Sequence, residues 1–303
     1  MQTLDRFRGC LLGLACGDAV GTTVEFRARG SFPPVTDMNG GGPFHLDAGD
    51  WTDDTSLALC LAASLTEQQG FDAADQMQRY VRWMDEGYYS STGECFDIGN
   101  ATAASLNRFK QTGEPYAGST DPYAAGNGSI MRLAPVPMWF YSDLERAIQF
   151  AGESSRTTHA AAECVDACKL YGAMLVAALS GTPKEDILNA PFDGLDPPAL
   201  SPKVQAIADG EYREKSEDDI SGSGYVVDSL EAALWCFYTT TTYRDAILRA
   251  VNLGDDADTT AAVCGQVAGA YYSVAGIPSE WLERLTMRHE IDRLAIELLS
   301  GGV

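Results

Sequence analysis

GDWTDDTSLALCLAASL, residues 49–65, sets two adjacent carboxylates, Asp53 and Asp54, directly before a long apolar and alanine-rich run. The spacing of the apolar side chains predicts a core helix over residues 54–68. Thr52 is a suitable cap for this helix, and acidic residues in a first turn are favoured by the helix dipole. Capping explains one aspartate easily and two less well, so the pair also points to a ligand site at the start of the helix.

Helical spacing dominates the rest of the chain as well, and alternating strand patterns are scarce. We therefore expect an all-α, multi-helix bundle. The predicted helices cover residues 3–18, 54–68, 72–86, 100–110, 143–152, 160–180, 225–238, 243–252, 259–274 and 279–299. Gly9, Gly13 and Gly17 recur every four positions, and a similar stripe of small residues runs from Ala261 to Gly269. Both of these helices should therefore approach a neighbour closely.

Three irregular segments interrupt the helical pattern, at residues 27–50, 112–128 and 191–203. None of them is long or polar enough to separate two domains, and 303 residues with 45% hydrophobic content can bury one large core. We therefore expect residues 1–303 to form a single domain. The glycine-containing segment 27–50 fits either a lid or a plain surface loop.

The formal net charge of −22 is spread over the whole chain. Such a charge repels nucleic acids and anionic membrane surfaces, so neither is an expected partner, whereas acidic clefts attract cations. The sequence shows neither a secretory signal pattern nor an apolar run of about 18 residues. Its eight cysteines include no Cys-x-x-Cys pair, which favours buried thiols in a reducing compartment. We expect a cytoplasmic protein.

A second acidic motif, NLGDDADTTAAVCGQ, occupies residues 252–266. Like the first motif, it combines a glycine, clustered aspartates, a threonine and an alanine-rich helix. If the two helix starts meet, they bring together four carboxylates, Asp53, Asp54, Asp256 and Asp258, whose charge two divalent cations would cancel. Oxygen ligands of this kind favour Mg²⁺, Mn²⁺ or Ca²⁺ over zinc. Spacing alone leaves open both a dimetal site and a pair of ordinary helix caps.

Two other kinds of metal site are excluded by the same residues. An EF-hand loop counted from Asp256 would need Gly and Glu where the chain has Ala261 and Val267. The chain has three histidines, and His289 lies in HEIDR rather than in an H-E-x-x-H motif. Carboxylates and hydroxyls therefore remain as the candidate ligands.

Five motifs, in order and spread over nearly the whole chain, carry a resemblance to a known family. They are GLACGDAVGTTVEF (13–26), WTDDT (51–55), DIGN (97–100), AGNGSIMR (125–132) and NLGDDADTTAAVCGQVAGAYY (252–272). With these motifs the sequence resembles the ADP-ribosylglycohydrolase family, in particular its bacterial dinitrogenase reductase-activating branch. The resemblance implies an all-α fold with a binuclear Mg²⁺ or Mn²⁺ centre and an activity that releases ADP-ribose.

The resemblance also implies roles for individual residues. The implied metal ligands are Thr52, Asp53, Asp54, Asp256, Asp258 and Thr259. Asp255 stands where some relatives have glycine, so we assign it no ligand role. Glu25 matches a glutamate that faces the cations and the scissile bond, where it would transfer protons, although a surface acid is the structural alternative. Asp97 matches an aspartate that meets the guanidinium or assists ribose opening in arginine-directed relatives.

The resemblance further implies a binding site for the nucleotide part of the substrate. The implied residues are Asn100, Gly126, Asn127, Gly128, Ser129, Met131, His159, Gly224 and Tyr225. Because Lys and Arg are few, backbone N–H groups of the turn and helix start in residues 126–132 should carry much of the phosphate binding, with Asn127 and Ser129 as side-chain donors. Tyr225 aligns with an adenine-stacking aromatic residue and His159 with a segment that lines the cleft. A core tyrosine and a helix-capping histidine are the structural alternatives.

These observations favour a metal-dependent hydrolase, acting as a monomer, that removes ADP-ribose from arginine side chains of modified proteins. An acid at position 97 suits a cationic leaving group and tips the choice to arginine. Serine-linked ADP-ribose and O-acetyl-ADP-ribose are alternative substrates. A non-catalytic ADP-ribose-binding protein and a dimetal nucleotide phosphohydrolase are alternatives of other classes, which the released product would separate.

Overall fold

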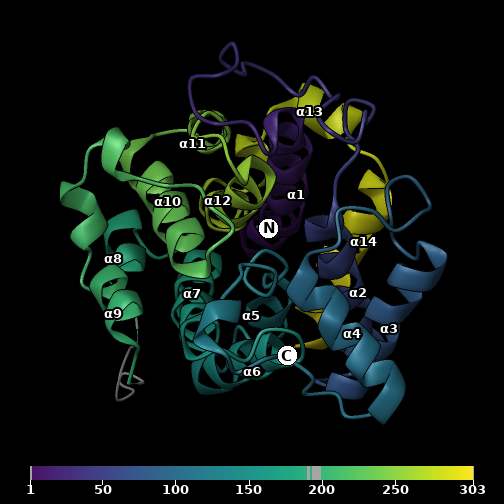
Figure 1. Ribbon diagram of the computed structural model, residues 1–303. Helices are drawn as coiled ribbons and strands as arrows, with labels where there is room; N and C mark the ends of the chain where they lie inside the picture. The colour runs from purple at the N-terminus through teal and green to yellow at the C-terminus, as the bar shows by residue number, and fades with distance from the viewer. Residues whose placement is uncertain (1, 190–191, 193–198, 303) are drawn as a thin grey trace.

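The computed structural model describes residues 2–189, 192 and 199–302 (Figure 1). This part of the chain consists of helices, turns and isolated β-bridges, with no strand, which confirms the all-α expectation. The α-helices are α1 (Gln2–Gly21), α2 (Asp53–Gln68), α3 (Ala73–Glu86), α4 (Asn100–Thr112), α5 (Pro135–Trp139), α6 (Leu144–Arg156), α7 (Ala162–Ser180), α8 (Lys184–Leu188), α9 (Pro202–Ala208), α10 (Val226–Thr239), α11 (Tyr243–Val251), α12 (Ala257–Tyr272), α13 (Ser279–Arg284) and α14 (Arg288–Gly301). Short 3₁₀ helices are η1 (Thr22–Val24), η2 (Pro122–Ala124), η3 (Glu211–Glu214), η4 (Glu217–Asp219) and η5 (Val274–Gly276).

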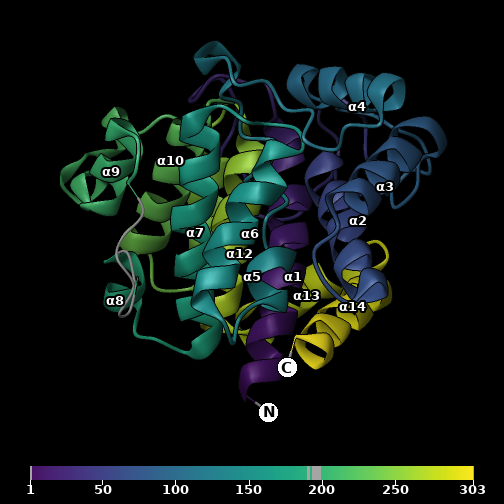
Figure 2. The same cartoon turned by 90° about the horizontal axis from the view of Figure 1, so that it is seen from below.

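Helix α1 lies at the centre of the molecule. All of its residues from Gly9 to Gly21 are buried. It packs most extensively against α12 and also contacts α14, α11, α7 and α2. Figures 1 and 2 show it enclosed by these helices from two directions. A helix buried on every side has an apolar surface all round, which explains why α1 reads as a continuous apolar run.

Glycines make the close packing of α1 on α12 possible, as the two stripes of small residues predict. A Cβ atom added to Gly13 would lie 2.4 Å from the carbonyl oxygen of Gly265, so the two backbones are in direct contact. The same contact recurs at the end of α1, where a Cβ on Gly21 would lie 2.4 Å from the Cα of Asp258. The stripe therefore fixes the C-terminal end of α1 against the first turn of α12.

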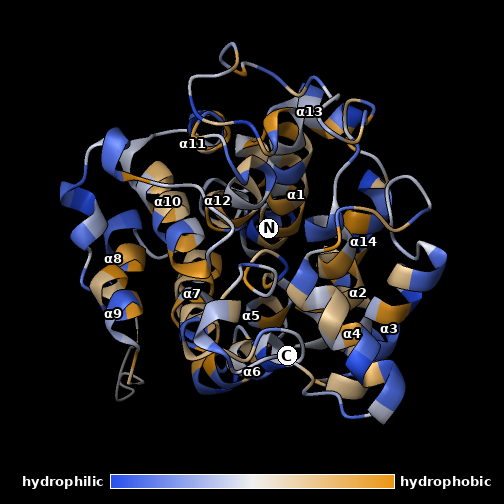
Figure 3. Ribbon diagram, in the orientation of Figure 1, coloured by the Kyte–Doolittle hydropathy of each residue, from blue (hydrophilic) through white to orange (hydrophobic). Residues whose placement is uncertain are grey.

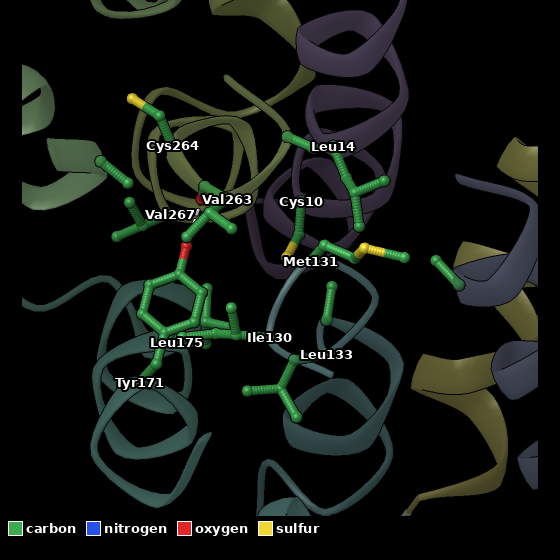
Figure 4. Close-up of a cluster of buried hydrophobic side chains, with 14 of the residues drawn as sticks. Cys10, Leu14, Ile130, Met131, Leu133, Tyr171, Leu175, Val263, Cys264 and Val267 are labelled. Carbon is green, nitrogen blue, oxygen red and sulfur yellow. Dashed lines mark hydrogen bonds between the residues drawn. The ribbon is translucent and has the colours of Figure 1, made fainter. Parts of the chain in front are cut away.

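A cluster of apolar side chains joins α1, α7, α12 and residues 130–133 (Figure 4). Tyr171 of α7 belongs to it and donates its hydroxyl proton to the carbonyl oxygen of Val263 in α12. The hydropathy colouring in Figure 3 shows that apolar residues predominate on the central helices and polar residues on the outer ones. Ile130 and Met131 of the cluster belong to the loop formed by residues 126–132, so the cluster anchors that loop to the core.

The predicted helix over residues 279–299 is wrong, because the structure divides it into α13 and α14. At the break the N–H of Thr286 donates to the carbonyl oxygen of Gly49 at 3.0 Å, and the indole of Trp51 donates to the carbonyl oxygen of Thr286 at 3.2 Å. Met287 has φ +51°, a left-handed conformation that ends the helical path. The break thus results from contacts with a distant segment, which periodicity does not reveal.

Other expectations differ from the structure only in short segments. Helices α5, α8 and α9 fall outside the predicted ranges and have five to seven residues each. Most of the linker-like segment 191–203 lies outside the described residues, and α9 begins within it. None of the described helices has the length and apolar character needed to cross a membrane.

The segment 27–50 packs against α13 and the end of α11. Val35 and Asn252 exchange two hydrogen bonds, of 2.8 and 3.0 Å. The carboxylate of Asp37 accepts hydrogen bonds from Trp281 at 2.6 Å and from Arg284 at 3.0 Å. These bonds tie the segment to the region of α11 and α13, so the structure places it as a packed loop beside the site rather than as a free flap.

Candidate metal-binding and catalytic site

The structure brings the two acidic motifs together at the starts of α2 and α12. The hydroxyl of Thr52 lies 3.3 Å from the carboxylate of Asp54 in its own motif and 3.2 Å from the carboxylate of Asp258 in the other. The hydroxyl of Thr259 lies 3.2 Å from Asp54 Oδ2. Segments about two hundred residues apart in the sequence therefore share one buried cluster of oxygen atoms.

Asp18 of α1 holds the start of α2 in place, and sequence reasoning missed it. Its carboxylate accepts hydrogen bonds from the N–H of Thr52 at 2.9 Å and the N–H of Thr55 at 3.0 Å. It also accepts from both threonine hydroxyls, at 3.0 and 2.6 Å. Thr52 itself makes no side-chain cap, so the capping explanation of this residue is wrong. The available signal was that Asp18 is the one charged residue between Gly9 and Gly21.

The carboxylates of the cluster find hydrogen-bond partners for only some of their oxygen atoms among the described residues. Glu25, Asp97 and Asp258 each offer an oxygen atom, and these atoms lie within 4.8 Å of one another. Within residues 2–189, 192 and 199–302, one oxygen each of Glu25, Asp54 and Asp258 is buried without a hydrogen-bond partner. Burial, and then repulsion by neighbouring carboxylates, raises the pKa values of Asp53, Asp54 and Asp258 well above the usual range. Buried carboxylate oxygens without donors form a donor set that fits a hard divalent cation.

Glu25 and Asp97 both line the cleft, and the pKa of each carboxyl group is raised. Burial raises the pKa of Glu25 to about 9, with further contributions from the charges of Asp97 and Asp256. Burial likewise raises the pKa of Asp97 to about 7, with Asp18 as the next cause. Asp97 also has φ +57°, a conformation that costs energy in a non-glycine residue. A strained backbone with a perturbed carboxyl in a cleft is typical of a functional position.

Asp255 ties the Glu25 segment to the second acidic motif through its backbone. Its N–H donates to the carbonyl oxygen of Arg27 at 2.8 Å, and its own carbonyl accepts from the N–H of Phe26 at 2.8 Å. Asp255 has φ +56°, which explains why glycine is suited to this position. Its side chain is exposed, so Asp255 is a connecting residue.

A cleft of about 800 Å³ opens over the acidic cluster. Its lining includes Glu25, Phe26, Asp53, Asp97, Gly99, Asn100, Thr102, Arg108, Tyr123, Gly126, Asn127, Gly128, Met131, His159, Gly224, Asp256 and Thr259. Most of the residues predicted for substrate and metal binding therefore share one cavity. Thr52, Asp54 and Asp258 lie buried beneath it.

Asn127 is occupied by internal hydrogen bonds. Its side-chain amide donates to Asp256 Oδ2 and to Ser229 Oγ, both at 2.8 Å. Its backbone N–H donates to the carbonyl oxygen of Gly224 at 3.1 Å. In this structure these contacts engage the amide of Asn127 and orient the carboxylate of Asp256, and the expected role of Asn127 as a phosphate donor stays a prediction.

His159 and Arg132 contact the loop of residues 126–132 and hold it in place. A Cβ on Gly128 would lie 2.7 Å from the ring of His159, so the close packing requires glycine there. Arg132 is fully buried and donates to the carbonyl oxygen of Gly128 at 2.6 Å and to Thr158 Oγ1 at 2.8 Å. Burial, with the charge of Arg132, lowers the pKa of His159 to about 3, so the ring is neutral. Arg132, to which the sequence analysis assigned no role, fixes this loop.

Two predicted substrate-binding residues lie outside the main cleft. Ser129 is buried, and its hydroxyl accepts a hydrogen bond from Ser155 at 2.9 Å, so it is not exposed to a phosphate. Tyr225 lines an adjoining hollow of about 600 Å³, where its hydroxyl donates to Glu163 and accepts from Lys203.

Residues 126–132 form turns, and α5 begins later, so the expected helix start within this loop is wrong.

Met131 serves both the cleft and the core. It contributes to the cavity lining, and Figure 4 shows it among buried side chains that include Cys10 and Leu14 of α1. Its neighbour Ile130 points into the same apolar cluster. The floor of the cleft is therefore continuous with the hydrophobic core.

Comparison with known proteins identifies a family and named relatives. The ADP-ribosylglycohydrolase family model matches residues 1–302. The chain is 49% identical to "ADP-ribosylarginine hydrolase Tri1" of Pseudomonas putida, over 99% of this chain and 79% of that protein. It is 43% identical to the protein of the same name from Serratia proteamaculans, over 98% of this chain and 80% of that protein.

More distant relatives and a solved structure give the same result. The chain is 31% identical to "ADP-ribosyl-[dinitrogen reductase] glycohydrolase" of Rhodospirillum rubrum, over 98% of this chain and 96% of that protein. A solved structure described as "ADP-ribosylglycohydrolase-related protein complex" is 44% identical and superposes with a TM-score of 0.88, covering 100% of this chain and 99% of that one. The fold, the buried acidic cluster and these similarities show that the chain belongs to the ADP-ribosylglycohydrolase family.

Proposed function

We propose that this protein hydrolyses the N-glycosidic bond between ADP-ribose and an arginine side chain, with two divalent cations, Mg²⁺ or Mn²⁺, in the acidic cluster. The observation that carries the proposal is the set of buried, unpartnered carboxylate oxygens beneath a cleft of about 800 Å³. The names of the two bacterial relatives with 49% and 43% identity support arginine as the linkage.

The proposed cation ligands come from the starts of α2 and α12. They are Thr52, Asp53, Asp54, Asp256, Asp258 and Thr259. Thr52 Oγ1 has one proton and lies 3.0 Å from Asp18 Oδ1, so donation to Asp18 leaves its lone pairs free for a cation. When bound, the cations supply positive charge that orients the distal ribose hydroxyls and stabilises charge in the transition state.

Glu25 and Asp97 act on the scissile bond in this proposal. Glu25 lies beside Asp97 and Asp258 and transfers protons in this proposal: it gives one to the leaving nitrogen atom as the C–N bond breaks, and takes one from the water whose oxygen bonds to the anomeric carbon. Asp97 faces the cationic leaving group with its carboxylate. Asn100, Gly126, Gly128, Met131, His159 and Gly224 shape the cleft for the nucleotide part of the substrate, and Tyr225 in the adjoining hollow is the aromatic residue proposed for the adenine.

The direct test offers arginine-linked, serine-linked and O-acetyl-linked ADP-ribose to the protein with Mg²⁺ or Mn²⁺, and measures free ADP-ribose. We expect release from the arginine-linked substrate, and loss of release with a chelator. Release from another linkage alone would identify that linkage as the substrate. Binding of ADP-ribose without release from any substrate would identify a binding protein, and AMP or phosphate as the product would identify a phosphohydrolase.

The proposal also covers the cellular compartment and the oligomeric state of the protein. All eight cysteines are free, which supports a reducing compartment such as the cytoplasm. We propose that a monomer is active, because the catalytic and ligand residues all come from one chain. Size-exclusion chromatography with light scattering, run beside the activity assay, tests this point.

Replacement of Asp18 tests how the cation ligands are held. In Asp18→Ala, the N–H groups of Thr52 and Thr55 lose their acceptors, which costs about 2 kcal/mol in unfolding free energy. Loss of the Asp18 charge beside Asp54 and Asp97 offsets part of this cost, so the decisive measurement is the affinity for Mn²⁺. Mn²⁺ affinity, measured by titration calorimetry, should fall by about 10- to 100-fold, as is typical when a residue that orients a ligand is removed. Asp5→Ala on the same helix, where the side chain is 43% exposed, serves as the control. Unchanged Mn²⁺ affinity in Asp18→Ala would contradict this role.

A further inference from the structure

Three aromatic rings contact one another in a row that begins at the cleft, and we call Phe26, Phe44 and Phe96 the aromatic rim. Phe26 follows Glu25 in the chain, lines the cleft and is 68% exposed. Its ring centroid lies 6.3 Å from that of Phe44, and the Phe44 centroid lies 5.2 Å from that of Phe96. Phe96 directly precedes Asp97.

The rim is held in position by backbone contacts. Phe26 has φ +61°, and its N–H donates to the carbonyl oxygen of Asp255 at 2.8 Å. Phe44 lies in a tight turn in which Gly41 and Leu46 exchange two backbone hydrogen bonds, of 2.7 and 3.0 Å. A strained residue that exposes a large apolar ring at a cleft has no evident role in folding, so a ligand is the better explanation.

Both acidic and basic residues adjoin the rim: Arg27 follows Phe26, but its guanidinium lies over the ring of Phe32, 5.4 Å from the centroid. Asp97 adjoins Phe96, and Glu25 adjoins Phe26. The cation–ring contacts found within the described residues involve other aromatic side chains, so no lysine or arginine of this part of the chain makes such a contact with the rim. Phe26 is the exposed ring of the three, and an exposed aromatic ring near a carboxylate can bind a planar cation from outside.

We propose that the aromatic rim, together with Asp97, recognises the guanidinium of the leaving arginine and so determines the choice of linkage. This inference rests on the proposed function. A guanidinium stacks on an aromatic face and donates to a carboxylate at the same time. A serine hydroxyl or an acetyl group has neither the charge nor the planar donor fork, so it gains nothing from the rim.

The experiment compares KM and kcat for ADP-ribosyl-arginine and O-acetyl-ADP-ribose in the wild type, Phe26→Ala, Phe26→Leu and Phe26→Tyr. Phe26→Ala and Phe26→Leu should raise KM for the arginine-linked substrate by roughly five- to tenfold, the size of a partly desolvated cation–ring contact. KM and kcat for the O-acetyl substrate should stay within about twofold of the wild-type values, because this substrate has no cation to bind the ring. Phe26→Tyr keeps an aromatic ring and should behave like the wild type. Tyr238→Ala, which removes a 44% exposed aromatic side chain from α10, is the matched control.

The outcomes separate the inference from the proposed function. If the wild type releases no ADP-ribose from the arginine-linked substrate, the proposed function is wrong. If the wild type does so and Phe26→Ala changes both substrates equally, the ring acts on ADP-ribose or on Glu25, and the inference is overturned. An unchanged KM for the arginine-linked substrate in Phe26→Ala and Phe26→Leu overturns it as well. If the wild type releases ADP-ribose only from the arginine-linked substrate, competitive inhibition by free arginine takes the place of the second substrate, and the inhibition constant should rise in Phe26→Ala.

Discussion

Asp258→Asn is expected to lower ADP-ribose release by on the order of 10³-fold while it stabilises the metal-free protein. A divalent cation contributes several kcal/mol of transition-state stabilisation, and each 1.36 kcal/mol corresponds to a factor of ten in rate. Asp258 is buried among Glu25, Asp54 and Asp256, which all raise its pKa. A neutral amide removes that repulsion, so the unfolding free energy of the metal-free protein at pH 8 should rise by about 1–3 kcal/mol.

Activity assays with excess Mn²⁺ and urea unfolding with a chelator measure the two effects. Asp209→Asn, a change of the same chemistry at an exposed position, should alter neither quantity. A mutation that inactivates an enzyme by damaging its fold lowers both quantities, so opposite signs are diagnostic of a binding site that costs stability. Loss of both activity and stability in Asp258→Asn would show that the cluster is structural.

The sequence predicts most of the long helices, and it raises a meeting of the two acidic motifs as one of two alternatives, for a definite physical reason. Periodic apolar residues and small-residue stripes are local patterns, and the packing of Gly13 on Gly265 follows from them. Two clusters of carboxylates at helix starts are tolerable in a core only when something compensates their charge, which pointed to a shared site.

The remaining features depend on contacts between segments that no local pattern links. Asp18 caps α2 from another helix, and Thr286 interrupts a regular helical pattern because it bonds to Gly49. Asn127 was expected to bind phosphate because of its place in a glycine loop, but its amide is already bonded to Asp256. In each case the side chain or backbone group has several possible partners, and only the tertiary structure selects one.

The metal-free protein should lose stability as the pH rises from about 6.5 to 8.5, and divalent cations should reverse this loss. The folded-state pKa values of Glu25 and Asp97 are raised to about 9 and about 7, and those of the buried aspartates are raised as well. In this window the folded state therefore holds protons that the unfolded state has already released. Stability then falls with pH, by up to about 1.4 kcal/mol per pH unit for each carboxyl that stays protonated in the folded state.

The limits of the pH window follow from other buried groups. His159 has its pKa lowered to about 3, so it adds stability with rising pH, but only up to the pKa of about 6.5 that it has when unfolded. Buried cysteines, whose pKa values are raised, add a loss of their own above about pH 8.5. Between these limits the carboxylate cluster dominates the change of unfolding free energy with pH.

Cations bind the deprotonated carboxylates of the folded state, so the stabilisation by Mn²⁺ should grow with pH across the same window. At a free concentration of about 100 times the Kd, one site contributes about 2.7 kcal/mol. Urea unfolding at pH 6.5, 7.5 and 8.5, with a chelator and with excess Mn²⁺, measures both slopes. In the metal-free protein, Glu25→Gln should make the unfolding free energy less dependent on pH, because the amide of glutamine does not titrate in this range. A metal-free stability that stays constant or rises over these pH values would mean that the cluster does not carry the charge that the cations are proposed to neutralise.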